Sequence, residues 1–178
     1  MKLAAALFLV VLISGCASMQ TANQSNETVR NDYTNQSANV ATGASRPDIL
    51  ESGYSGTVLA GSVSPVIEFN MNDYQAAAGS NKIILLYFYA NWCPVCRAEV
   101  PEMYSAFSEV NDARAIAFRV NFNDDQTDSN EVEMARLFGV PYQHTKVIVK
   151  NGQVQLKSTE SWNKNRYLFE INKALSMP

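Results

Sequence analysis

The fold is decided by the stretch Tyr87-Phe88-Tyr89-Ala90-Asn91-Trp92-Cys93-Pro94-Val95-Cys96. An unbroken apolar run, Ile83 to Tyr89, stops at a tryptophan and two cysteines spaced C-x-x-C. A run of this kind is typical of a buried strand. The apolar residues that follow recur at the spacing of a helix: Val100, Met103, Tyr104, Phe107 and Val110. The stretch therefore predicts a buried strand that leads into a helix with two thiols at its N-terminus.

The position of the two thiols has a chemical consequence. The first turn of a helix offers unpaired N–H groups and the positive end of the macrodipole, and both stabilise a thiolate. A thiolate is the species that attacks a disulfide. We interpret Cys93 as the exposed attacking thiol and Cys96, one turn further, as the resolving thiol. A structural zinc site is disfavoured, because zinc takes four ligands and residues 63–178 supply only two cysteines and one histidine.

The region from about residue 63 to 178 resembles the thioredoxin superfamily, including its TlpA-like envelope members. The W-C-x-x-C motif at Trp92–Cys96 carries the resemblance. Pro101 matches a helix-kinking proline, and Lys150-Asn151-Gly152 matches a hairpin turn. The resemblance implies an α/β thioredoxin fold, with a central mixed β-sheet flanked by helices.

The remaining elements follow from local patterns on both sides of this stretch. We expect an edge strand at 66–69, a short helix at 73–78 and, after the central strand and helix, a second parallel strand at 115–122. A helix capped by Asp128 or Ser129 is expected at about 128–138. A hairpin at 146–159 and a final helix at 163–175, capped by Asn163, complete the domain.

The N-terminus is predicted to be a lipoprotein signal peptide, residues 1–15. Lys2 supplies a short positive region, and Leu3 to Ile13 is apolar but too short to span a bilayer. Ile13-Ser14-Gly15-Cys16 resembles a bacterial-type lipobox, which implies cleavage before Cys16 and lipid attachment to it. The alternative is an ordinary cleaved signal peptide. In either case the domain is exported, to a compartment where disulfides persist.

Residues 16–62 are rich in Asn, Gln, Ser and Thr, which predicts a flexible tether. Within it, 49–59 is more apolar and is expected to pack loosely on the domain.

The whole chain of 178 residues has a net charge of −3 and no basic run. Nucleic acid is therefore not an expected partner.

Thioredoxins carry a cis-proline that faces the cysteine pair, and two residues compete for its place here. Pro141 is the obvious candidate. Counting back from the Asn151-Gly152 hairpin without a gap instead places His144 there, followed by Thr145 as in the family. We prefer His144, because Pro141 would need three inserted residues.

A histidine at this position has two possible roles. It could stabilise the Cys93 thiolate or move protons during exchange. Alternatively, Cys93, Cys96 and His144 could bind Cu(I), which resembles the Sco copper chaperones. Those proteins space their cysteines C-x-x-x-C, whereas the spacing here is C-x-x-C.

A further departure concerns the buried aspartate that thioredoxins place six residues before the first cysteine. Tyr87 stands at that position, and a phenol is a poor base near neutral pH. Water, His144 or a carboxylate such as Glu99 must then accept the proton of the second thiol. Glu99 and Glu102 themselves fit a solvated helix face.

These observations predict a membrane-anchored, extracytoplasmic thiol–disulfide oxidoreductase. Its substrates would be disulfides or thiols of envelope proteins, docked over Trp92 and the segment Val140–Thr145. It needs no bound cofactor, and a separate membrane or periplasmic partner would exchange electrons with it. The intervening Pro94-Val95 does not give the direction of electron flow.

Overall fold

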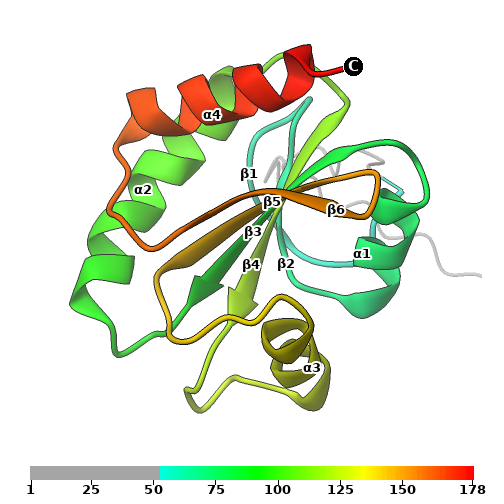
Figure 1. Cartoon of the computed structure of the whole chain (residues 1–178). Helices are drawn as coiled ribbons and strands as arrows, with labels where there is room; N and C mark the ends of the chain where they lie inside the picture. The colour runs from blue at the N-terminus through cyan, green and yellow to red at the C-terminus, as the bar shows by residue number, and fades with distance from the viewer. Residues whose placement is uncertain (1–52) are drawn as a thin grey trace, which may run out of the picture. The chain divides into compact units, whose positions relative to one another are not determined.

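The computed structural model describes residues 53–178 (Figure 1). Apart from β1, its elements follow the order expected from the sequence. They are β1 (Val58–Ala60), β2 (Val66–Glu68), α1 (Met71–Ala78), β3 (Ile83–Tyr89), α2 (Pro94–Glu109), β4 (Ala115–Asn121), α3 (Ser129–Leu137), β5 (Thr145–Lys150), β6 (Gln153–Ser158) and α4 (Lys164–Ser176).

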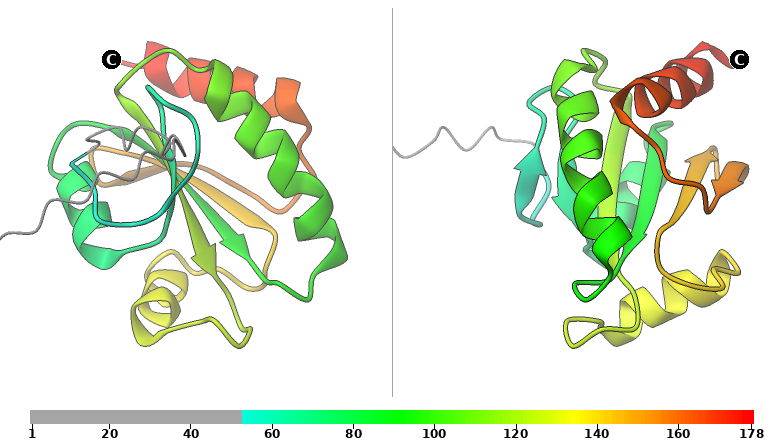
Figure 2. Two further views of the ribbon diagram at one scale, coloured as in Figure 1. Left: turned by 180° about the vertical axis from the view of Figure 1, so that it is seen from behind. Right: turned by 90° about the vertical axis from the view of Figure 1, so that its left-hand side faces the viewer.

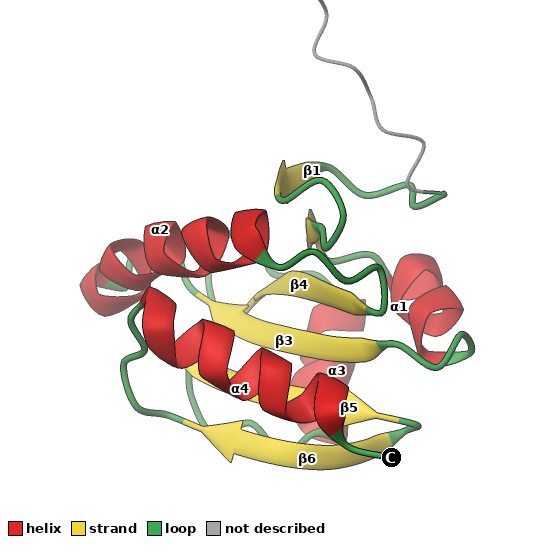
Figure 3. Ribbon diagram, turned by 90° about the horizontal axis from the view of Figure 1, so that it is seen from above, coloured by secondary structure: helices red, strands yellow, loops and turns green. Residues whose placement is uncertain are grey.

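The strands form one mixed sheet in the order β1-β2-β4-β3-β5-β6, with β3 near its centre (Figure 2). Strands β2, β4 and β3 run parallel, whereas β1, β5 and β6 each pair antiparallel with a neighbour. Helices α2 and α4 cover one face, and α1 and α3 cover the other (Figure 3). The predicted mixed sheet flanked by helices is confirmed.

The apolar run of β3 is explained by burial on both faces of the sheet. Leu85 and Tyr87 belong to the core beneath α2 and α4, while Leu86 and Phe88 belong to the core beneath α1 and α3. All four side chains are completely buried. Because neither face of this strand meets solvent, the sequence shows no alternation of polar and apolar residues there.

The domain begins earlier than residue 63. Strand β1 pairs antiparallel with β2, so β2 is not the edge strand that we predicted. The segment before β1 is held by the buried Asp73 carboxylate, which accepts hydrogen bonds from the backbone N–H groups of Ser55 and Gly56 at 3.0 and 2.7 Å. These long-range contacts agree with the expectation that residues 49–59 pack on the domain, for the part of that segment that the structure describes.

The other predicted segments lie outside the described residues. They are the signal peptide at 1–15, the lipid-attachment residue Cys16 and the tether up to residue 52. Among residues 53–178, no helix has the length and apolar character that a membrane crossing requires.

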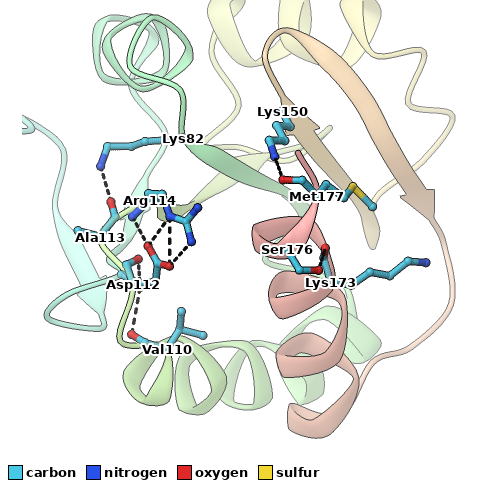
Figure 4. A network of polar contacts seen from close by, with 10 residues as sticks. Lys82, Val110, Asp112, Ala113, Arg114, Lys150, Lys173, Ser176 and Met177 are labelled. Atoms are coloured by element: carbon cyan, nitrogen blue, oxygen red, sulfur yellow. Dashed lines mark hydrogen bonds and ion pairs between the residues drawn. The ribbon is translucent and has the colours of Figure 1, made fainter.

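Polar contacts close the end of the sheet opposite the cysteines (Figure 4). Lys82 Nζ, just before β3, donates to the Ala113 carbonyl at 2.5 Å, and Arg114 forms an ion pair with Asp112. Lys150 Nζ, at the end of β5, donates to the Met177 carbonyl at 2.5 Å. Tyr87 and Lys146, the completely buried titratable residues of the described strands, lie towards the other end of the sheet.

Candidate active site

The two cysteines lie where β3 ends and α2 begins, as predicted. Cys93 is the N-cap of α2, and its Sγ accepts a hydrogen bond from the backbone N–H of Cys96 at 3.1 Å. Pro94 occupies the first turn, where a missing N–H has no cost. Both thiols are free.

The prediction that Cys93 is exposed is wrong. Only 4 % of Cys93 is accessible, because its Sγ turns inward to cap the helix instead of pointing into solvent. Cys96 is still the more enclosed of the two, with no accessible surface. The order of access therefore agrees with Cys93 as the attacking sulfur.

Cys96 requires help to lose its proton. Burial raises the pKa of the Cys96 thiol to about 11, and the neighbouring Cys93 adds to the effect. A hydrogen bond with Tyr87 acts in the opposite direction. At neutral pH Cys96 is therefore a thiol, and it must transfer its proton before it can attack a disulfide.

Tyr87 lies behind the cysteine pair and is completely buried. Its hydroxyl is hydrogen-bonded to Cys96 and lies 3.2 Å from Nδ1 of His144. Burial, followed by the negative charge of Glu99, raises the pKa of Tyr87 far above its ordinary value. The side chain is thus a stable phenol that can donate one proton while it receives another.

His144 directly precedes β5, whereas Pro141 lies three residues earlier on an exposed segment. The backbone N–H of His144 donates to the Phe88 carbonyl at 2.7 Å, which places the residue beside the end of β3. Thr145 follows as the first residue of β5, and its hydroxyl donates to the Tyr142 carbonyl at 2.8 Å. His144 has a φ of 69°, which is uncommon for a residue with a side chain.

Both ring nitrogens of His144 contact protein atoms. Nδ1 meets the Tyr87 hydroxyl, and Nε2 lies 3.2 Å from Ser161 Oγ and 3.1 Å from Glu99 Oε2. Burial and then the charge of Lys146 lower the pKa of His144, against the opposing effect of Glu99. The imidazole is therefore neutral at pH 7. Because Nε2 lies beside a carboxylate oxygen of Glu99, the tautomer that fits carries hydrogen on Nε2 and accepts from the Tyr87 hydroxyl at Nδ1.

Glu99 is not on a solvated helix face, which corrects the prediction. Only 4 % of the residue is accessible, and its Oε1 lies 3.0 Å from Lys146 Nζ and 2.5 Å from the Tyr167 hydroxyl. Lys146 is completely buried and also donates to the Glu160 carbonyl. Burial lowers the pKa of Lys146, and Glu99 counters that effect. Its neighbour on the helix, Glu102, is exposed as expected.

Lys146 and Tyr167 were not among the site residues predicted from the sequence. A signal for Lys146 was present, since alternation along β5 places it on the same face as Ile148, which is in the core. Tyr167 lies on the apolar stripe of α4 and resembled an ordinary core residue. Neither position could be connected to Glu99 without knowing that α2, α4 and β5 meet.

Apolar side chains surround the cysteines at the surface. Trp92, Val95 and Tyr142 are each about half exposed, and the indole of Trp92 is fixed by a hydrogen bond from Nε1 to the Asn123 carbonyl at 3.0 Å. Pro94 is also exposed. A groove of about 330 Å³ opens beside this surface. It is lined by Val95, Ala98, Glu99, Glu102, Ser161, Trp162 and Asn163.

The arrangement does not fit the copper site considered from the sequence. Within residues 53–178, no group of three or more His, Cys, Asp or Glu side chains is placed to hold a metal ion. His144 directs Nδ1 to Tyr87 and Nε2 to Ser161 and Glu99. A site made of Cys93, Cys96 and His144 would require the imidazole to leave these partners.

Comparison with known proteins agrees with the predicted fold. The family model described as Thioredoxin matches residues 65–173. Thioredoxin H4 of Arabidopsis thaliana is 35% identical over 78 residues, which are 44% of this chain and 60% of that protein. A thioredoxin of Coprinus comatus is 33% identical over 84 residues, which are 47% of this chain and 74% of that protein.

Among solved structures, the crystal structure of thioredoxin f from spinach chloroplast is similar in fold. It has a TM-score of 0.50 and 20% sequence identity, covering 62% of this chain and 94% of that one. The chain thus aligns with nearly the whole of this structure, but with less than two thirds of the Arabidopsis protein.

Proposed function

The chain belongs to the thioredoxin family, and from this premise we propose that it is a thiol–disulfide oxidoreductase that acts on other proteins. The observation that carries the proposal is the contact between Cys93 Sγ and the N–H of Cys96 at the N-terminus of α2. An N–H donor and the helix dipole both stabilise negative charge on that sulfur. The second thiol stands one turn away, as resolution requires.

The reaction proceeds in two exchanges. The Cys93 thiolate attacks a substrate disulfide, forms a mixed disulfide and releases one substrate thiolate. Cys96 then loses its proton and attacks Cys93 Sγ, which closes the Cys93–Cys96 disulfide and releases the second substrate thiolate. Two electrons pass to the substrate, and a dithiol donor must restore the reduced pair. The same steps in reverse oxidise a substrate dithiol.

The cellular setting is the finer part of the proposal. The lipobox-like sequence ending at Cys16 supports a lipid-anchored protein on the extracytoplasmic side of a membrane. Its substrates would then be envelope proteins, docked on the exposed Trp92, Val95 and Tyr142. A Cys16→Ala variant is expected to lose lipid labelling and to leave the membrane fraction. Retention of both would remove the anchor from the proposal.

Trapping of substrates tests the activity itself. In the full chain, Cys96→Ser should accumulate mixed disulfides with protein substrates, because no second thiol resolves them, whereas Cys93→Ser should trap none. The wild-type chain should also reduce insulin disulfides in the presence of dithiothreitol. Equal trapping by both variants, or the absence of insulin reduction, would contradict the proposal.

The reduction potential of the pair would then give the direction of electron flow. A value near −270 mV would support a reductase, and one between about −180 and −120 mV an isomerase or oxidant.

A further inference from the structure

A line of polar groups leads from the buried Cys96 to the surface. Cys96 is hydrogen-bonded to the Tyr87 hydroxyl, which lies 3.2 Å from His144 Nδ1. On the far side of the imidazole, Nε2 lies 3.2 Å from Ser161 Oγ. Ser161 is exposed and lines the groove beside α2. Both contacts of the imidazole on this line are within hydrogen-bonding reach, and Tyr87 lies close enough to Cys96 to act on the pKa of its thiol.

We propose that Tyr87 and His144 form a proton relay that takes the proton of Cys96 and passes it towards Ser161 during resolution of the mixed disulfide. This inference rests on the proposed oxidoreductase activity and deepens it. It assigns to a tyrosine and a histidine the proton transfer that the family resemblance would place on an aspartate at position 87.

The transfer balances without any further reactant. The Cys96 proton moves to the Tyr87 oxygen as the Tyr87 proton moves to His144 Nδ1, so Tyr87 remains neutral and the imidazole becomes an imidazolium. The Cys96 thiolate then attacks Cys93 Sγ. The imidazolium returns to its neutral form when Nε2–H gives its proton to solvent at Ser161, or to the departing substrate thiolate.

The surrounding groups leave His144 Nδ1 as the acceptor of the Tyr87 proton. Glu99 Oε1 is occupied by Lys146 and Tyr167. Lys146 has no free electron pair while it is an ammonium group, and Tyr87 alone cannot become a stable phenolate in this setting. The neutral Nδ1 of His144 is then the remaining base in contact with Tyr87.

Glu99 also prepares the site for the charge that develops on the imidazole. Its Oε2 is buried and, among the described residues, accepts no hydrogen bond, yet it lies 3.1 Å from His144 Nε2. Lys146 already pairs with Oε1, but a buried carboxylate oxygen without a hydrogen-bond donor is costly. An imidazolium would place a second positive charge beside Oε2, so Glu99 acts as a positioning residue for the relay.

The pH response depends on all the groups that face His144. Tyr87 on β3, Glu99 on α2 and Ser161 before α4 contact the imidazole, and Lys146 on β5 acts on it through its charge. One step further out, Cys96 neighbours Tyr87, Tyr167 on α4 contacts Glu99, and the Glu160 carbonyl accepts from Lys146. The positive Lys146 discourages a permanently charged imidazole and the negative Glu99 favours a transient one. The group is thus neutral at rest and can accept a proton.

The reaction of the reduced full chain with the aromatic disulfide DTNB separates the two exchanges. Attack by Cys93 releases the first thionitrobenzoate, and resolution by Cys96 releases the second. We expect Tyr87→Phe and His144→Asn each to slow the second release on the order of 10²-fold at pH 7 without slowing the first. Asparagine is chosen because it tolerates the positive φ of residue 144. Tyr104→Phe is the matched control, since it removes the hydroxyl that binds Arg119.

The pH profile distinguishes a relay from a structural role. In the wild type, the second release should slow as the pH falls below about 6.5 and His144 becomes protonated, and His144→Asn should abolish this inflection. Added imidazole should partly restore the rate of a His144→Gly variant. An unchanged second release, or equal slowing of both releases, would overturn the relay. Absence of any second release in the wild type would instead overturn the oxidoreductase function.

Discussion

The buried pair of Glu99 and Lys146 gives a sharp prediction about stability. Their side chains are 3 % and 0 % accessible, and Oε1 lies 3.0 Å from Nζ. Glu99→Gln keeps the shape of the side chain but leaves the Lys146 ammonium buried without a negative partner. Loss of one member of such a pair costs about 3–5 kcal/mol. We expect about 3 kcal/mol, because glutamine can still accept from Tyr167 and Lys146 keeps the Glu160 carbonyl.

Urea unfolding of the reduced protein at pH 7 measures this cost. Glu102→Gln is the matched control, since Glu102 lies on the same helix but is exposed and only accepts a hydrogen bond from Lys164 N at 2.8 Å. It should lose less than about 1 kcal/mol. The double variant Glu99→Gln, Lys146→Met should recover most of the loss, because it removes the unpaired charge.

The loss of stability in Glu99→Gln should also depend on pH. In Glu99→Gln the folded pKa of Lys146 falls further below its unfolded value of about 10.5, so the unfolded chain binds more protons between the two values. The deficit relative to the wild type should therefore shrink as the pH rises towards 10.5. A loss below about 1 kcal/mol, or a double variant no more stable than the single one, would refute the reasoning.

Three further predictions concern stability. Folding lowers the pKa of His144, so the unfolded chain binds a proton at this residue at a higher pH than the folded chain does. The free energy of unfolding should therefore fall as the pH drops below about 6.5, and this dependence should be absent from His144→Asn. The pKa of Cys96 is raised from 9.0 to about 11, so the reduced protein should lose stability as the pH rises from 9 to 11, which Cys96→Ala should prevent. Asp73→Ala removes the hydrogen-bond acceptor for Ser55 and Gly56, so it should lower the free energy of unfolding in urea by about 1–3 kcal/mol. It should also expose the segment around Ser55 and Gly56 to proteases, and unchanged cleavage there would contradict the role given to Asp73.

Much of the fold could be predicted because its determinants are local. The apolar run of β3, the cysteine cap of α2 and the Asn151-Gly152 turn each lie within a few residues of sequence. Both turn residues have positive φ, at 51° and 71°, as a tight hairpin requires. The start of the domain was misplaced because β1 has only three residues and depends on pairing with β2, while the segment before it is held by the distant Asp73.

The sequence alone determined that two thiols stand at the start of a helix, since strand, cap and helix are neighbours in the chain. Only the tertiary structure decided how the second thiol loses its proton. Glu99, His144 and Tyr167 lie far apart in sequence and meet where α2, β5 and α4 pack together. Whether a carboxylate is solvated or buried depends on what packs over it, and the spacing of residues along one helix does not contain that information.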